Sequence, residues 1–132
     1  MSLVKALGLG SPIIEEYLQD VYQLKKTTFE DVKSGTIHES VNMFGSKVAR
    51  LNLQLKKVEG DFICRYSKLA SMENFPEHIT GTLDISFTNI RSLDDIPDTS
   101  KMQVDGDFVC TNLRFTEDYV RSHCQVKGTV YC

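Results

Sequence analysis

The chain has 132 residues, of which 41% are hydrophobic and 25% charged, with a formal net charge of −3 and four cysteines. This length is typical of one domain, and the apolar fraction suits a packed core, which argues against wholesale disorder. The slightly acidic balance argues against a dedicated nucleic-acid-binding protein. No uncharged apolar run approaches the roughly 18–20 residues of a membrane helix, and the N-terminus lacks the cleavage pattern of a signal peptide. We therefore expect a soluble, cytoplasmic protein with no membrane partner.

Residues 11–26 are predicted to form the first element, an amphipathic helix. Ser11 can cap its N-terminus, and Pro12 suits its first turn. The apolar positions at helical spacing form a stripe on one face, made up of Ile13, Ile14, Tyr17, Leu18, Val21 and Leu24. We assign residues 1–34 to an N-terminal helical cap for the structure that follows. The alternative is that this helix docks on another protein.

From residue 37 onward, the chain repeats a pattern of apolar residues at alternating positions. The full pattern has a glycine at its third position, and it occurs as Val58-x-Gly60-x-Phe62-x-Cys64, Ile79-x-Gly81-x-Leu83-x-Ile85, Val104-x-Gly106-x-Phe108-x-Cys110 and Val126-x-Gly128-x-Val130-x-Cys132. A weaker copy, Ile37-x-Glu39-x-Val41-x-Met43, lies 21 residues before the first of these. The glycines are 21, 25 and 22 residues apart. Alternation with period two predicts that each copy is a β-strand with one apolar face and one polar face.

The segments between these strands repeat as well. A hydroxyl residue stands three residues after each of the first three strands, as Ser46, Ser67 or Thr88, with apolar residues at fixed offsets around it. Such hydroxyl groups can bond to the backbone in a tight turn. A unit with one strand and an irregular return predicts a solenoid of about five stacked parallel strands over residues 35–132, which with its helical cap is an α/β fold. The alternative is an ordinary β-hairpin or meander protein.

Three of the repeats carry a turn pattern that resembles the LxLxxNxL core of leucine-rich repeats. The matching segments are Val41-x-Met43-x-x-Ser46-x-Val48, Phe62-x-Cys64-x-x-Ser67-x-Leu69 and Leu83-x-Ile85-x-x-Thr88-x-Ile90. The phrase Val-x-Gly-Asp-Phe-x-Cys and the segment from Phe115 to Gly128 are similar to the small leucine-rich-repeat-like proteins of large tailed bacteriophages and prophages. Ser or Thr stands where Asn is usual, and Gly stands where the strand would normally carry Leu. The resemblance covers residues 35–132 and implies a fold and a phage source, but no common biochemical activity.

The C-terminal part is predicted to contain a short helix followed by a last strand. Thr116 can cap the helix, and Tyr119, Val120 and Cys124 are expected to face inward. The strand over residues 126–132 then lies at the edge of the sheet. An edge strand is either a pairing hazard or a binding opportunity, so self-association through this strand is a second hypothesis about function.

The cysteines at the repeat position are expected to point into the core. Adjacent strands lie about 4.8 Å apart, so Cys64 and Cys110, which are two layers apart, are too distant for a disulfide. Cys110 and Cys132 lie in adjacent layers and can reach each other. We nevertheless expect reduced cysteines, because nothing in the sequence marks export to an oxidising compartment.

The outward face of the predicted strands is the candidate binding surface. Stacking places Ile63, Val109 and Tyr131 in one column around Asp84, with acidic residues in the neighbouring columns. An apolar strip with an acidic border is typical of a protein-binding surface, and solenoids commonly bind through their strand face. The alternative is a solvated face with a few tolerated apolar residues. The residues assigned to partner contact are Glu59, Asp61, Ile63, Arg65, Asp84, Asp105, Asp107, Val109 and Tyr131.

No motif for catalysis, cofactor binding or metal binding is present in the sequence. His38, His78 and His123 occupy unrelated repeat positions, so a shared metal site is not expected. We expect a non-enzymatic protein-interaction module, a phage-encoded adaptor or inhibitor that binds a basic host or phage protein in the host cytoplasm. The alternative is a virion or assembly component that associates through the C-terminal edge strand. Mimicry of a nucleic acid by the acidic columns is a weaker third reading, and nucleic acid itself is not an expected partner.

Overall fold

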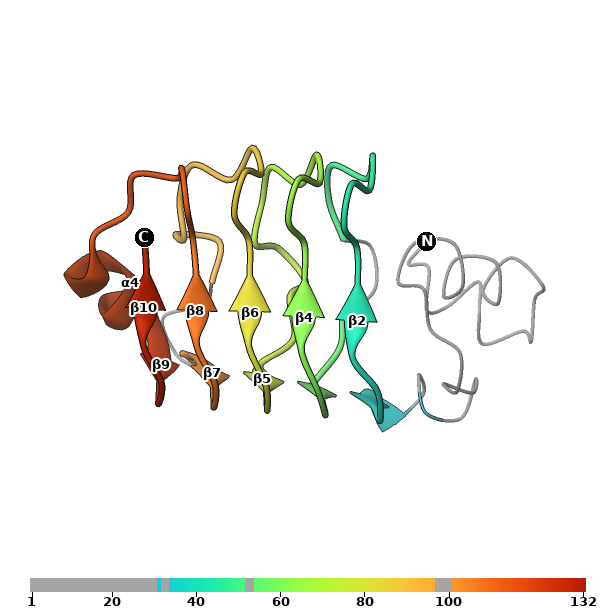
Figure 1. Ribbon diagram of the computed structural model, residues 1–132. Helices are drawn as coiled ribbons and strands as arrows, with labels where there is room; N and C mark the ends of the chain where they lie inside the picture. The colour runs from blue at the N-terminus through green and yellow to red at the C-terminus, as the bar shows by residue number, and fades with distance from the viewer. Residues whose placement is uncertain (1–30, 32–33, 52–53, 97–100) are drawn as a thin grey trace.

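The repeats stack as successive coils of a solenoid, in which every coil contributes one short strand to each of two parallel sheets (Figure 1). The computed structural model describes residues 31, 34–51, 54–96 and 101–132. Sheet A has the strand order β1-β3-β5-β7-β9, and sheet B has the order β10-β8-β6-β4-β2. The strands of sheet A are β1 (Thr36–Ile37), β3 (Lys57–Val58), β5 (His78–Ile79), β7 (Met102–Val104) and β9 (Cys124–Val126). The strands of sheet B are β2 (Val41–Asn42), β4 (Phe62–Ile63), β6 (Leu83–Asp84), β8 (Phe108–Val109) and β10 (Val130–Tyr131).

The prediction of stacked parallel strands is confirmed, but the prediction of one strand per repeat is wrong. Each expected strand is divided by a bend, for example at residues 59–61 between β3 and β4. The repeated glycines lie at this bend, where neighbouring coils approach closely. A Cβ atom on Gly106 would lie 2.7 Å from the carbonyl carbon of Gly81, and the Gly106 N–H donates to the Gly81 oxygen at 2.9 Å. The glycine therefore allows the chain to change from one sheet to the other while the coils stay in contact.

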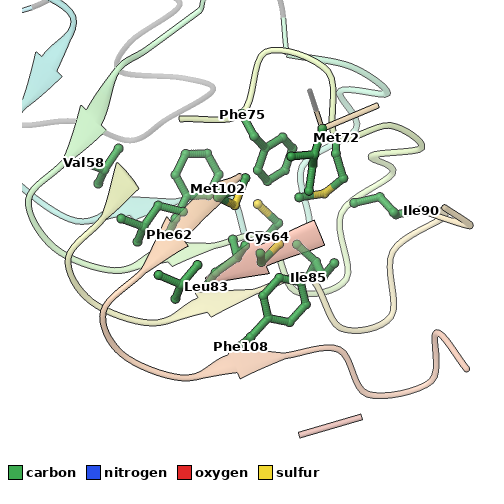
Figure 2. Close-up of a cluster of buried hydrophobic side chains, with 14 of the residues drawn as sticks. Val58, Phe62, Cys64, Met72, Phe75, Leu83, Ile85, Ile90, Met102 and Phe108 are labelled. Carbon is green, nitrogen blue, oxygen red and sulfur yellow. The ribbon is translucent and has the colours of Figure 1, made fainter. Parts of the chain in front are cut away.

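The core lies between the two sheets and the return segments of the coils. Figure 2 shows strand residues such as Phe62, Leu83 and Phe108 directed toward return-segment residues such as Met72 and Phe75. Phe62, Leu83 and Phe108 are fully buried, and the ring centroids of Phe62 and Phe75 are 5.2 Å apart. The apolar repeat positions thus fill a continuous interior, as expected for stacked repeats that cannot bury their apolar face alone.

The loops that follow the sheet B strands are the upper loops in Figure 1. The Thr88 hydroxyl donates to the Ile85 carbonyl at 2.8 Å, and the Ser46 hydroxyl accepts from the Val48 N–H at 3.2 Å. These two bonds confirm the predicted turn role at those positions. The third hydroxyl, that of Ser67, is buried and has no hydrogen-bond partner in the described part of the chain.

A short helix, α4 (Glu117–His123), replaces the extended return path in the last complete coil. Its predicted N-cap is confirmed, because the Thr116 side chain accepts a hydrogen bond from the Tyr119 N–H at 3.1 Å. Val120 and Cys124 are buried as predicted, and Tyr119 is half-buried. The helix predicted over residues 11–26, like almost all of the cap assigned to residues 1–34, lies outside the described residues.

Candidate partner-binding surface

The predicted outward column exists on sheet B. The register pairs Asn42 with Ile63, Ile63 with Asp84, Asp84 with Val109, and Val109 with Tyr131. Along each strand the preceding residue points into the interior, so these five side chains share the outer face of the sheet. Tyr131 is 53% exposed, while Ile63, Asp84 and Val109 are half-buried. We call this set the outer column.

Arg65 lies beside the outer column and links it to a group of aromatic rings in the upper loops. Its guanidinium lies 3.4 Å from the Asp84 carboxylate and 5.0 Å from the Phe87 ring centroid. The rings of Tyr66 and Phe87 are stacked, with centroids 4.7 Å apart and an angle of 11° between their planes. Phe44 packs edge-on against Tyr66 at 5.5 Å. Arg65 is therefore held in place by an ion pair and by cation–π contact.

Two of the predicted acidic contact residues have a role inside the solenoid. Asp61 accepts a hydrogen bond from the Thr82 N–H of the next coil at 2.8 Å, and Asp107 accepts one from the Thr129 N–H at 2.8 Å. The hydroxyls of Ser40 and Thr82 occupy the same register position and likewise accept N–H groups of the following coil. These side chains at the bend bond each coil to the next. Less of the negative charge of Asp61 and Asp107 is therefore free for a partner than the sequence indicated.

The other two acids at the bend are paired with basic side chains. Glu59 is in contact with the ring of His38. Asp105 accepts a hydrogen bond from the His78 ring at 2.8 Å and lies 3.4 Å from Lys127. The hydrogen bond from His78 is the main reason that the pKa of Asp105 is lowered. The expectation of a basic partner stays a prediction, but these internal contacts weaken its physical basis.

The oxidation state of one cysteine pair differs from the expectation. Cys110 and Cys132 form a disulfide, with Cα atoms 4.6 Å apart, so the prediction that they are reduced is wrong. They meet because Phe108 and Val130 are in register, which places the following repeat positions side by side on adjacent coils. Cys64 and Cys124 are free and buried. Burial raises the pKa of Cys64 well above its usual value and that of Cys124 to about 12, so neither is a thiolate nucleophile near neutral pH.

The C-terminal end of the solenoid is half covered. Arg121 on α4 donates to the carbonyl oxygens of Val126 at 2.8 Å and Gly128 at 3.1 Å. In the preceding coils, the equivalent oxygens of Val104 and Gly106 accept N–H groups from the next coil. The guanidinium thus donates to carbonyl groups of a kind that, in the preceding coils, pair with the next coil along sheet A and the bend. Sequence analysis missed this role, because no spacing pattern distinguishes Arg121 from an ordinary exposed helix residue.

Sheet B has no such cover in the described part of the chain. The N–H groups of Phe62, Leu83 and Phe108 each donate to the next coil, at distances of 2.8, 2.9 and 3.0 Å. By the same pattern the N–H of Val130 points away from β8, where no further strand is described. The prediction that the last strand lies at a sheet edge is confirmed for β10.

A group of polar side chains at the end of α4 is the nearest approach to a catalytic arrangement. His123 Nε2 lies 3.2 Å from Asp94 Oδ1, and its Nδ1 lies 2.9 Å from the Ser122 Oγ atom. The Ser122 hydroxyl donates to the Tyr119 carbonyl at 2.6 Å, which uses its proton in a helix-end bond. These contacts tie the end of α4 to a neighbouring loop. That the protein is not an enzyme stays a prediction.

Among the described residues, no group of three or more His, Cys, Asp or Glu side chains is arranged to hold a metal ion. Over the same residues, no helix has the length and apolar character required to cross a membrane.

Comparison of the chain with models of protein families, with curated proteins and with solved structures gave no match.

Proposed function

We propose that this chain is a non-enzymatic protein-interaction module that binds a protein partner through the outer face of sheet B. The observation that carries the proposal is the outer column, in which Ile63, Val109 and Tyr131 are aligned by the register on an exposed face. This column continues through Arg65 into the exposed rings of Phe44 and Tyr66. Aromatic residues and arginine dominate the binding energy of protein interfaces. Exposed aromatic rings beside partly exposed apolar side chains are typical of an interaction site.

The resemblance to small phage proteins supplies the biological setting of the proposal. We infer an adaptor or inhibitor encoded by a phage or prophage, which acts on a host or phage protein. The nine assigned contact residues then divide by role. Ile63, Arg65, Asp84, Val109 and Tyr131 contact the partner directly. Glu59, Asp61, Asp105 and Asp107 hold the bend in shape beside that surface.

Partner capture by surface variants tests this proposal. The tagged protein is expressed in the host, and co-purified proteins are quantified by mass spectrometry. The double variant Ile63→Lys with Val109→Lys places two charges in the outer column and should lower recovery of the specific partner at least about tenfold. The matched control Thr36→Lys with Gln125→Lys adds the same charge to the outer face of sheet A. Equal recovery by both double variants would refute the sheet B face as the site.

The open edge of β10 favours one alternative, a structural protein that associates through this strand. Its backbone donors, which have no partner strand among the described residues, are a template for a strand from a second copy. The variant Val130→Pro removes the outward N–H without removing a bond to β8, and proline is tolerated on edge strands. Light scattering over a range of protein concentrations checks the alternative. If the chain associates through β10, its measured mass should rise with concentration, and Val130→Pro should abolish this rise. A mass that stays equal to that of one chain would exclude the alternative.

A further inference from the structure

The upper loops carry positively charged side chains, although the net charge of the chain is negative. We define the turn edge as residues 43–50, 64–70, 85–91 and 110–116, which follow the four complete strands β2, β4, β6 and β8 (Figure 1). These segments contain no aspartate or glutamate. Their basic residues are Lys47, Arg50, Arg65, Lys68, Arg91 and Arg114. A chain with a net charge of −3 therefore has one edge that is entirely basic.

Four of these six basic side chains have no ion-pair partner in the described part of the chain. Arg65 pairs with Asp84 at 3.4 Å and Arg50 with Glu73 at 3.5 Å. The exposed side chains of Lys47, Lys68, Arg91 and Arg114 have no carboxylate within ion-pair distance among the residues that the structure describes. The Lys68 N–H donates to the Ser46 carbonyl at 2.8 Å, which places Lys47 and Lys68 side by side on adjacent coils. Like charges on adjacent coils repel each other, and an anion between them relieves this repulsion.

The aromatic rings on the same edge are held at a conformational cost. Tyr66 and Phe87 have φ angles of 60° and 56°, in the left-handed region that large side chains rarely adopt. The equivalent positions in the neighbouring coils are Gly45 and Asn112, which adopt this region readily. Phe44 and Tyr66 are 55% and 50% exposed, so burial does not explain these aromatic residues. Strain of this kind is typically retained at binding sites.

The packing of the rings selects the kind of partner. Tyr66 and Phe87 stack on each other, and the Arg65 guanidinium lies 5.6 Å and 5.0 Å from their centroids. Single-stranded nucleic acids bind by stacking bases on free ring faces, and here Tyr66 and Phe87 each occupy one face of the other ring. The ring edges, which carry the positive end of the aromatic quadrupole, remain available to carboxylates and aliphatic side chains.

We propose that the turn edge binds an acidic polypeptide segment that carries apolar side chains. Its carboxylates contact Lys47 and Lys68, and its apolar side chains pack on Phe44 and Tyr66. This inference rests on the proposed protein-binding function and names the chemistry of the partner, which is acidic rather than basic. The turn edge adjoins the outer column through Arg65, so one partner can contact both surfaces.

Fluorescence anisotropy with synthetic probes tests the inference. The probe is a short fluorescein-labelled peptide of alternating Glu and Leu, titrated at about 50 and about 300 mM NaCl. We expect binding that weakens at the higher salt concentration. A peptide of alternating Lys and Leu and a labelled oligothymidylate serve as the opposite-charge and nucleic-acid probes, and both should bind less tightly. Absence of binding by the Glu-Leu peptide, or tighter binding of either other probe, would overturn the inference.

Matched variants locate the site. Lys47→Glu with Lys68→Glu should weaken binding of the Glu-Leu peptide at least about tenfold. The control Lys56→Glu with Lys57→Glu makes the same change in net charge away from the turn edge and should leave the affinity within about twofold. Tyr66→Asn introduces the residue found at the equivalent Asn112, so folding is retained while the ring is lost, and affinity should fall about fivefold.

The outcomes separate this inference from the function on which it rests. Equal loss in the two lysine double variants would show a non-specific charge effect and overturn the turn edge as a site. Loss in Ile63→Lys with Val109→Lys but not in Lys47→Glu with Lys68→Glu would also overturn it, while the sheet B binding function stands. Circular dichroism and the unfolding midpoint confirm that each variant is folded.

Discussion

At the scale of single residues, the bend between the two sheets depends on side chains that are small or that bond to the next coil. Gly106 approaches Gly81 so closely that no Cβ fits, and Asp61 and Asp107 each accept a backbone N–H from the following coil. In the weakest repeat, Glu39 stands at the glycine position. That coil is the first of the described stack, so no described coil precedes it at the bend.

The glycine contact gives a stability prediction. Gly106→Ala should lower the free energy of unfolding by at least about 2 kcal/mol, because the Cβ would force two stacked coils apart. Gly45→Asn is the control, since Gly45 has open space around it and a φ of 69° that asparagine accepts. It should cost about 0.5 kcal/mol or less. Urea denaturation of both variants measures the difference, and equal small losses would contradict the close contact.

At the scale of elements, α4 is a return segment and a cap at the same time. The helix lies in the last complete coil, where its Arg121 occupies the carbonyl groups that a further coil would otherwise pair. Glu117 lies one turn earlier and orients the guanidinium through a contact of 2.8 Å. Solenoid ends require such covers to avoid uncontrolled stacking.

The cap gives a second stability prediction. Arg121→Ala should lower the free energy of unfolding by about 1–2 kcal/mol, because two carbonyl groups lose a charged donor. Amide hydrogen exchange should also accelerate in β9 and β10. Glu117→Gln removes the i,i+4 ion pair but keeps the donor, so it should cost only about 0.3–0.5 kcal/mol. If Arg121→Ala costs no more than Glu117→Gln, the guanidinium does not cap the sheet.

At the scale of the whole molecule, the repeat pattern was sufficient to predict the stacking of coils but not their cross-section. Period-two alternation is the same on both sides of Gly60, so it does not reveal that the chain changes sheets there. The outer column was predictable, because register in a parallel stack follows from repeat spacing alone. The internal contacts of Asp61, Glu59 and Asp105 were not, since they depend on where neighbouring polar groups lie in space.

The distribution of charge is also a property of the whole molecule, and the net charge does not reveal it. The carboxylates at the bend are paired or bonded to backbone, while the turn edge carries six basic side chains and no acid. This basic edge was readable in the sequence once the turns were aligned. The acidic excess is a poor guide to the binding surface, because exposed acids and internally bonded acids look the same in a sequence.

The cysteine pairing is tested by counting thiols. The structure predicts two free thiols, Cys64 and Cys124, when the native protein is denatured without a reductant, and four after reduction. Alkylation followed by peptide mass spectrometry should identify the joined pair as Cys110 and Cys132. Four free thiols before reduction would contradict the disulfide and would restore the expectation from the sequence.

The most direct test of the central claim is hydroxyl-radical footprinting of the protein alone and bound to its captured partner. Tyr131, Tyr66 and Phe44 are half or more exposed and oxidise readily, so they report on the sheet B face and the turn edge. We expect the partner to protect Tyr131 and Tyr66 from oxidation, while oxidation of Tyr119 in α4 is unchanged. Protection of Tyr119 with no change at Tyr131 and Tyr66 would contradict binding through this face.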